Sequence, residues 1–446
     1  MPVGWRAASS LLVANVVGTG VLSLGGAMVA LGWMPGLVAL VGFAPLNFYC
    51  AALLGRAYLL LVAQDHNPGD YFEIARLTLS PIYASLVGLC LYLNLVLTCA
   101  DYLLVMAKAL QAVIFSVRLC APTSGALSAL PLLLLVQCKT MADLSSVSVI
   151  SAVSITGALI ICISQLIRES QHADEAGSGV LYNDTTSIFT KVSATNAMLF
   201  ASNVQTLFVN ILSEMAQPSH FNRTIGGALS LFMTLYLGVA VLSYYAEGGD
   251  TPGYLLDALP FTAARTWAGL CMFIHVAISF SISCQVVSRA LVQRIQSSGH
   301  PRYYRFEDSR DPGDCSEENE KHHTPTDHQN CPRWIVWLVV SLSIVVGAWI
   351  LANGIPFFFD LAALIGSLTL TPLAFLFPPL IFIGAAQKCG VAVTSWELFA
   401  LYTLVAFGCV FGIVGFVGTI IDITADWSAL EAPPFSCQCE AERCAS

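Results

Sequence analysis

Charged residues are scarce in this sequence, and their scarcity excludes a soluble globular protein. Lys, Arg, Asp and Glu make up 11% of the 446 residues, whereas soluble domains use about 25%. Hydrophobic residues make up 56%, and they form long blocks rather than amphipathic stripes. Such blocks are typical of helices that face lipid. The sequence therefore predicts an all-α polytopic membrane protein.

Signatures of membrane-bound enzymes and pumps are also missing. There is no G-x-x-x-x-G-K-[ST] phosphate-binding loop, which argues against an ATP-driven pump within this chain. There is no H-E-x-x-H pair either, which argues against an intramembrane metalloprotease. We therefore expect no enzymatic activity, no catalytic residue, no cofactor and no nucleic-acid partner. A transporter, a channel and a receptor remain, each in contact with the lipid bilayer.

The apolar blocks predict eleven transmembrane helices at about 20 residues per crossing. We expect them near residues 9–31, 36–62, 82–116, 124–138, 146–167, 192–213, 225–245, 266–292, 333–353, 357–384 and 396–422. We expect them to form one transmembrane domain over residues 1–422, followed by an extracytoplasmic tail, 423–446.

One long polar segment interrupts the apolar blocks. Residues 295–332 are charged and poor in apolar residues, which predicts a disordered cytoplasmic loop. The loop contains two Cys and three His that could bind zinc, but their spacing matches no common zinc module. We therefore assign no metal site to Cys315, His322, His323, His328 or Cys331.

The distribution of Lys and Arg predicts the orientation. With a cytoplasmic N-terminus, about thirteen of these side chains lie in the inner segments and about five in the outer ones, as the positive-inside rule requires. The plasma membrane and the vacuolar or lysosomal membrane fit this pattern equally well. The sequence indicates no protein partner.

Two glycines flank a hydroxyl residue in the first predicted span, at Gly18, Thr19 and Gly20. Glycine weakens a helix, and a broken helix in a transporter frees backbone N–H groups that bind a substrate carboxylate. Small residues in a membrane helix also permit close helix packing. Taken alone, the motif is compatible with both interpretations.

The sixth predicted span favours the first interpretation. Its stretch Thr195–Thr206 is too polar for a helix exposed to lipid, so it should face the bundle interior or a wet cavity. The first and sixth spans occupy corresponding positions if the chain contains two inverted repeats, about 9–167 and 192–384, and an extra helix, about 396–422. Paired interrupted helices at such positions indicate a midplane binding site.

Four segments, in order, resemble the amino acid/auxin permease family. They are Asn15–Trp33, Leu130–Ser146, Glu214–Phe221 and Ile355–Pro378. The resemblance implies a LeuT-type fold, a 5+5 inverted repeat plus one helix, that moves amino acids by coupling to H⁺ or Na⁺. Carried over by position, the substrate-binding residues are Val17, Gly18, Thr19, Gly20 and Val21 in the first helix, Tyr102 in the third, and Phe200, Ala201, Ser202 and Asn203 in the sixth.

One departure from the family pattern bears on the coupling ion. The sodium-coupled branch commonly has Asn four residues before the first glycine of the break. Ala14 occupies that position here, and Asn15 lies one residue later. The departure favours protons over sodium.

Asp101 is the sharpest candidate for the coupling proton. It lies near the middle of the third span, where a charged Asp costs several kcal/mol unless it is paired or protonated. Lys108 is seven residues further on, roughly 10 Å along the helix axis, too far for direct contact. A buried structural carboxyl is the alternative reading.

Two residues of the eighth span are further candidates. His275 could titrate near neutral pH, and Ser279 could ligate Na⁺. For His275 a structural histidine with satisfied hydrogen bonds is the favoured interpretation, whereas for Ser279 hydrogen bonds across helices explain the residue equally well.

These observations predict a secondary active amino acid transporter, an H⁺ symporter that works by alternating access. The alternatives are a Na⁺-coupled transporter, a channel, and an amino-acid-sensing receptor without net transport.

Overall fold

The computed structural model describes residues 4–114, 119–137, 141–172, 179–297, 333–430 and 435–436. Throughout these ranges the regular elements are helices, and no strand is present. Most of the predicted loop 295–332 lies outside the described residues, as do its Cys and His residues and most of the tail 423–446.

Eight helices in the described ranges are long and apolar enough to cross a membrane. They are α3 (Trp33–Val62), α5 (Pro81–Val113), α7 (Met141–His172), α10 (Phe221–Glu247), α11 (Ala263–Ser297), α12 (Arg333–Gly354), the run from α13 (Phe358–Ile365) to α14 (Phe377–Lys388), and α15 (Ser395–Ala429). The prediction of a polytopic helical membrane protein is confirmed.

The other three predicted spans consist of shorter helices. The first contains α1 (Trp5–Val16), the 3-10 helix η1 (Thr19–Ser23) and α2 (Leu24–Leu31). The fourth is α6 (Ala121–Leu135), and the sixth is divided into α8 (Ile188–Ser202) and α9 (Gln205–Glu214). Two of these three spans are therefore interrupted, and both interruptions lie within stretches that the sequence marks as unusual.

The short helix α4 (Tyr71–Thr78) was not expected. The Glu73 N–H donates to the Asp70 carboxylate at 2.7 Å, and the Gly69 N–H donates to the Glu73 carboxylate at 2.7 Å. This reciprocal capping satisfies free N–H groups at the start of the helix. Because α4 has only eight residues, hydropathy blocks do not reveal it.

Several helices extend past the expected boundaries, and one span contains π-helical turns. α15 continues to Ala429, past the predicted end at residue 422, and the Trp427 indole donates to the Gly354 carbonyl at 3.0 Å. Between α13 and α14 the backbone forms the π-helical turns η5 (Gly366–Leu370) and η6 (Pro372–Leu376). Pro372 lacks an N–H and cannot continue an α-helical ladder.

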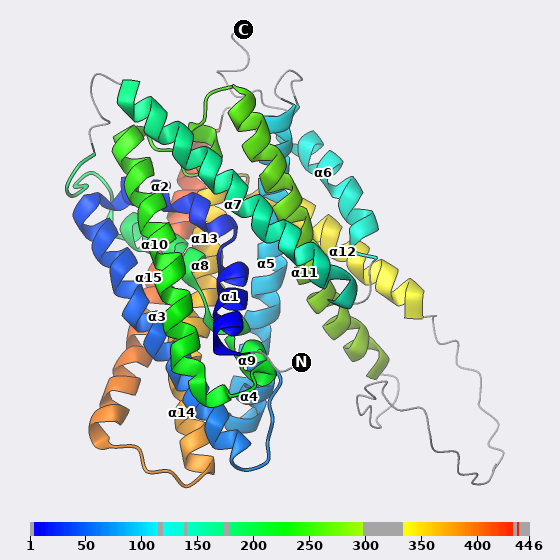
Figure 1. Ribbon diagram of the computed structural model, residues 1–446, viewed down its shortest axis with the longest axis vertical. Helices are drawn as coiled ribbons and strands as arrows, with labels where there is room; N and C mark the ends of the chain where they lie inside the picture. Colours follow the sequence, from blue (N-terminus) through cyan, green and yellow to red (C-terminus); the bar gives the residue numbers. More distant parts are fainter. Residues whose placement is uncertain are drawn as a thin grey trace, which may run out of the picture.

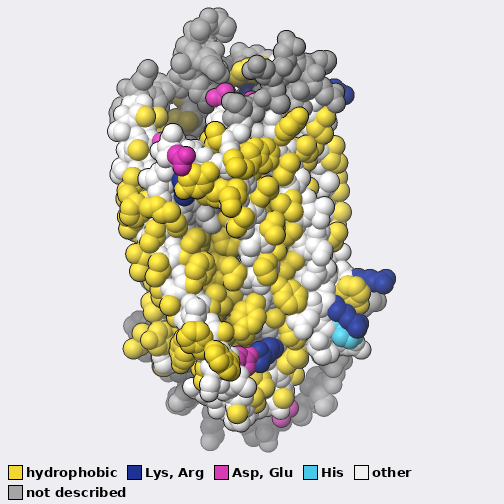
Figure 2. Space-filling model, turned by 90° about the vertical axis from the view of Figure 1, so that its left-hand side faces the viewer, with side chains coloured by type: hydrophobic (Ala, Val, Ile, Leu, Met, Phe, Trp, Pro, Cys, Tyr) yellow, Lys and Arg dark blue, Asp and Glu magenta, His cyan; other side chains and the backbone are white. Residues whose placement is uncertain are grey.

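The interrupted helices lie inside the bundle. Figure 1 shows α1 and α8 between α3 and α10 on one side and α5 and α11 on the other. The π-helical region also contacts this interior, because the Thr371 hydroxyl donates to the side-chain carboxamide oxygen of Asn196 in α8 at 2.7 Å. On the face shown in Figure 2, hydrophobic side chains cover the middle of the molecule, and the visible charged side chains lie towards its ends. This distribution suits a surface in contact with lipid.

Candidate functional site

The first span is interrupted directly before Thr19. α1 ends at Val16, Val17 is extended, and Gly18 has φ −141° and ψ −149° before η1 begins. The first N–H groups of a helix have no partner within it. The interruption therefore leaves backbone donors at the start of η1 and backbone acceptors at the end of α1.

The sixth span is interrupted at Asn203 and Val204, later than the sequence suggests. Phe200, Ala201 and Ser202 still belong to the last turn of α8, and Asn203 is the first extended residue. The Asn203 carboxamide oxygen accepts from the Thr206 hydroxyl at 3.1 Å and from its N–H at 3.4 Å. Asn203 thus caps the start of α9, which places the break after the α8 turn.

Polar side chains from a second helix support this break. The Gln205 carboxamide accepts from the Val204 N–H at 3.2 Å and donates to the Asn47 side chain of α3 at 3.0 Å. Asn47 in turn donates to the Ser202 hydroxyl at 3.4 Å. All three side chains are fully buried, so this network replaces the helix hydrogen bonds that the break removes.

The two breaks contact each other. A Cβ atom built on Gly20 would lie 2.6 Å from the Ala201 Cα, so only glycine permits this approach. The Tyr236 hydroxyl of α10 lies 2.8 Å from the Ala201 carbonyl oxygen and 3.0 Å from the Val16 carbonyl oxygen. Tyr236 was not among the expected site residues, because an aromatic residue in an apolar block carries no distinguishing signal.

Asp101 of α5 faces the first break. It is fully buried, and the Thr19 hydroxyl donates to its Oδ2 at 2.7 Å. Its Oδ1 is buried without a hydrogen-bond partner in the described structure. As the spacing predicts, Lys108 does not pair with Asp101; it forms an ion pair with Asp257 at 2.8 Å. Tyr102, the next residue of α5, is partly buried.

His275 of α11 approaches the same break from another side. Its Nδ1 contacts the Ser151 hydroxyl of α7 at 2.8 Å. Its Nε2 is buried, has no partner among the described groups, and would lie 4.0 Å from a Cβ on Gly18. The structure therefore brings His275, Asp101 and Thr19 to one region of the bundle.

The two sodium candidates are less well defined. Ser279 lies one turn beyond His275 on α11 and is partly buried. Asn15 lies in α1, and its side chain is outside the described part of the structure. Within the described ranges, no group of three His, Cys, Asp or Glu residues is arranged to hold a metal ion.

The segment 251–260 covers one end of this region. Its 3-10 helix η4 (Leu255–Ala258) contacts η1, and Tyr254 is 2% exposed, with its ring 5.1 Å from that of Phe358. Asp257 in η4 pairs with Lys108 of α5 and, at 3.4 Å, with Arg265 of α11. These ion pairs tie the covering segment to two membrane helices.

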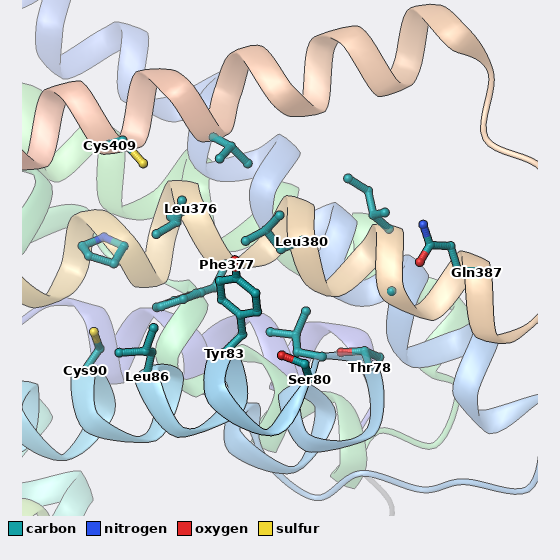
Figure 3. A pocket seen from close by; sticks show the side chains of 15 residues that line it. Thr78, Ser80, Tyr83, Leu86, Cys90, Leu376, Phe377, Leu380, Gln387 and Cys409 are labelled. Atoms are coloured by element: carbon teal, nitrogen blue, oxygen red, sulfur yellow. The ribbon is translucent and has the colours of Figure 1, made fainter.

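A groove of about 740 Å³ lies elsewhere, between α5, α14 and α15 (Figure 3). Apolar side chains such as Leu376, Phe377 and Leu380 line most of it, and the Tyr83 and Leu86 side chains are exposed at its edge. None of the expected site residues lines this groove. It is therefore separate from the two helix breaks.

Comparison with solved structures shows the same fold. A Na⁺-coupled sialic acid symporter in a substrate-bound, outward-open state aligns with a TM-score of 0.52 and 14% identity, covering 97% of this chain and 91% of that one. MhsT in complex with L-phenylalanine aligns with a TM-score of 0.52 and 10% identity, covering 93% and 98%. The fold is thus the LeuT-type fold implied by the resemblance.

Sequence comparison identifies the family. The N amino acid transport system protein of Neurospora crassa is 25% identical over 387 residues, 85% of this chain and 76% of that protein. Amino acid permease 6 of Arabidopsis thaliana is 25% identical over 452 residues, 92% and 90% of the two chains. Such permeases are not enzymes. The family model described as transmembrane amino acid transporter protein matches residues 1–421, and the chain therefore belongs to this family of integral membrane transporters.

Proposed function

We propose that the chain is a proton-coupled amino acid symporter that works by alternating access around the two helix breaks. One observation carries the proposal: the Thr19 hydroxyl links the first break to the buried Asp101 carboxyl at 2.7 Å. A titratable group thereby contacts a side chain of the break that is expected to hold the substrate.

The substrate would bind between the two breaks. The N–H groups at the start of η1 are suited to an amino acid carboxylate, because a helix N-terminus attracts anions. The Asn203 Nδ2 is buried without a partner in the described structure, and a substrate side chain or carboxylate could accept its hydrogen bond. Val17, Val21, Tyr102 and Phe200 would supply the surrounding apolar surface.

The surroundings of Asp101 favour proton coupling. A buried carboxylate that receives a single hydrogen bond is costly. A protonated carboxyl could instead donate from Oδ1 to a bound substrate, so substrate and proton would stabilise each other's binding. The buried Nε2 of His275 is a second acceptor for a proton near the same break.

Sodium coupling is the second candidate. A relative with the same fold is described as a Na⁺-coupled symporter, and here Asn15 and Ser279 would be the residues to test. The 14% identity supports the fold and not the ion.

We also propose that the N-terminus is cytoplasmic. The protein itself would lie in the plasma membrane or in a vacuolar or lysosomal membrane. Cys120, between α5 and α6, is disulfide-bonded. Disulfides persist in oxidising compartments, which supports an extracytoplasmic position for this end of α5. We further propose two inverted repeats over about 9–167 and 192–384, because each would begin with an interrupted span.

Asp101→Asn tests the proposal in proteoliposomes that contain the purified protein. Asn can still accept from Thr19, and its N–H₂ group imitates a protonated carboxyl. We expect a pH gradient to drive amino acid accumulation by the wild type, and Asp101→Asn to accumulate at least about tenfold less while still exchanging labelled for unlabelled substrate. Asp65→Asn is the matched control, because Asp65 is exposed and has φ +60°, which Asn tolerates.

Each of the other possible uptake results would support a different function or coupling residue. Accumulation by Asp101→Asn at the wild-type level would exclude Asp101 as the coupling residue. Accumulation driven only by a Na⁺ gradient would support the sodium alternative. Amino acid binding without accumulation under either gradient would support the sensing receptor.

A further inference from the structure

The Tyr236 hydroxyl lies between the carbonyl ends of the two interrupted helices. Val16 is the last residue of α1, and Ala201 lies in the last turn of α8. Their carbonyl oxygens lie 3.0 and 2.8 Å from the hydroxyl oxygen. Tyr236 itself is fully buried, so water does not compete for this position.

Both carbonyls need a positively polarised partner. The last carbonyls of a helix have no N–H partner within it, and they carry the negative end of the helix dipole. In transporters with broken helices, such half-helix ends coordinate the coupling cation. Here two of these ends converge on a single hydroxyl group.

We propose that the Tyr236 hydroxyl takes the place of a coupling cation between the two breaks. Its one hydrogen, shared between two carbonyls, joins α1 to α8 without any ion. This inference rests on the proposed function and deepens it, since a position suited to Na⁺ is filled by a neutral group of the chain.

The position is well suited to a substitution test. The ring of Tyr236 packs against Phe232 with centroids 5.3 Å apart, so Tyr236→Phe should keep the ring in place and remove one oxygen atom. The variant would leave the Val16 and Ala201 carbonyl oxygens directed at one region without a donor, which favours a small cation between them. The variant should therefore acquire a Na⁺ requirement that the wild type lacks.

Tyr244→Phe is the matched control. Tyr244 lies on the same helix and is also fully buried. Its hydroxyl contacts the backbone of Val180, accepting from the N–H at 3.0 Å, and does not contact the breaks. Losing this hydroxyl should lower stability without creating a cation site.

The experiment compares the midpoint of thermal unfolding, Tm, of the purified wild type and both variants in about 100 mM NaCl and in choline chloride. We expect Na⁺ to raise the Tm of Tyr236→Phe by about 3 °C more than that of the wild type or of Tyr244→Phe. Gradient-driven uptake by Tyr236→Phe should likewise fall in choline and recover in Na⁺. If Tyr236→Phe is not recovered folded, Tyr236→Leu is measured in its place.

Equal responses of all three proteins to Na⁺ would overturn the inference, whether those responses are large or absent. The Tm measurement needs no amino acid. A Na⁺ response specific to Tyr236→Phe, in a protein that transports nothing, would therefore retain the inference and reject the proposed function. If the wild type accumulates amino acids and all three proteins show equal Tm responses to Na⁺, the proposed function is retained and the inference about Tyr236 is rejected.

Discussion

The contact between Thr19 and Asp101 joins two buried polar side chains of different helices. The hydroxyl belongs to the first break and the carboxyl to the middle of α5, and both residues are at most 2% exposed. In such surroundings a single hydrogen bond to a carboxyl has a large effect, because removing it leaves a buried group without any donor.

Thr19→Val should impair transport while preserving the shape of the break. Losing the donor to a buried carboxyl costs about 1–3 kcal/mol, which corresponds to roughly a 5- to 150-fold loss. We expect uptake to fall by about 5- to 150-fold. Thr19→Ser, which keeps the hydroxyl, should retain most activity. Initial uptake rates in proteoliposomes measure both, and equal rates for Thr19→Val and Thr19→Ser would contradict a role for the hydrogen bond.

The sequence reveals single residues better than the contacts between them. Gly18 and Gly20 stand out because glycine is unfavourable in a helix, and Asp101 because a charge interrupts an apolar block. The hydrogen bond from Thr19 to Asp101 joins positions 82 residues apart, and no local pattern predicts such a pair. Tyr236 was missed because its importance lies entirely in the backbone oxygens that it contacts.

At the scale of helices, the close approach of η1 to α8 is the most demanding feature of the site. The obstacle that a side chain on Gly20 would meet is backbone, the Ala201 Cα at 2.6 Å, and backbone in a packed bundle does not move aside cheaply. The two interrupted helices therefore form one packed unit.

Gly20→Ala should separate the two breaks and destabilise the protein. Overpacking of this kind costs about 1–3 kcal/mol, so we expect Tm to fall by several degrees and uptake to be lost. Gly42→Ala in α3 is the matched control, since a Cβ there meets nothing within 4 Å and alanine favours the helix by about 1 kcal/mol. Equal Tm changes in the two variants would contradict the close approach.

The long helices and the two interrupted spans were predictable from the sequence, whereas α4 and the exact end of α8 were not. Hydropathy finds α3, α5 and α10 because a lipid-facing helix must be apolar throughout. It does not detect α4, which is held by the capping of Asp70 and Glu73. Hydropathy also does not predict where α8 ends. There the Asn203 and Gln205 side chains accept hydrogen bonds from the backbone N–H groups of Thr206 and Val204.

At the scale of the whole molecule, the ion pairs of Asp257 close one end of the bundle. They connect the segment 251–260 to α5 and α11, and they lie on the extracytoplasmic side in the proposed orientation. Alternating access requires this end to open, so these ion pairs would have to break during each transport cycle.

Asp257→Asn should shift the molecule towards the state open on that side. The Lys108 and Asp257 side chains are 23% and 31% exposed, so solvent screening limits the effect to about 1 kcal/mol, roughly a fivefold change in population. The probe is the variant Tyr254→Cys. We expect its new thiol to react with a membrane-impermeant thiol reagent about fivefold faster when Asp257→Asn is also present than when it is not. Asp250→Asn, on the exposed part of the same loop, is the control, and equal rates in the two backgrounds would argue against the gate.

The Tyr236 contact also has a consequence for synthesis of the chain. Tyr236 is separated from Val16 by 220 residues, which a ribosome takes about 10–45 s to translate. Lipid offers no hydrogen-bond donor, and Tyr236 can donate to the Val16 carbonyl only after α10 has been synthesised. The link between the two breaks is therefore completed late, after α1 and α8 have both been synthesised.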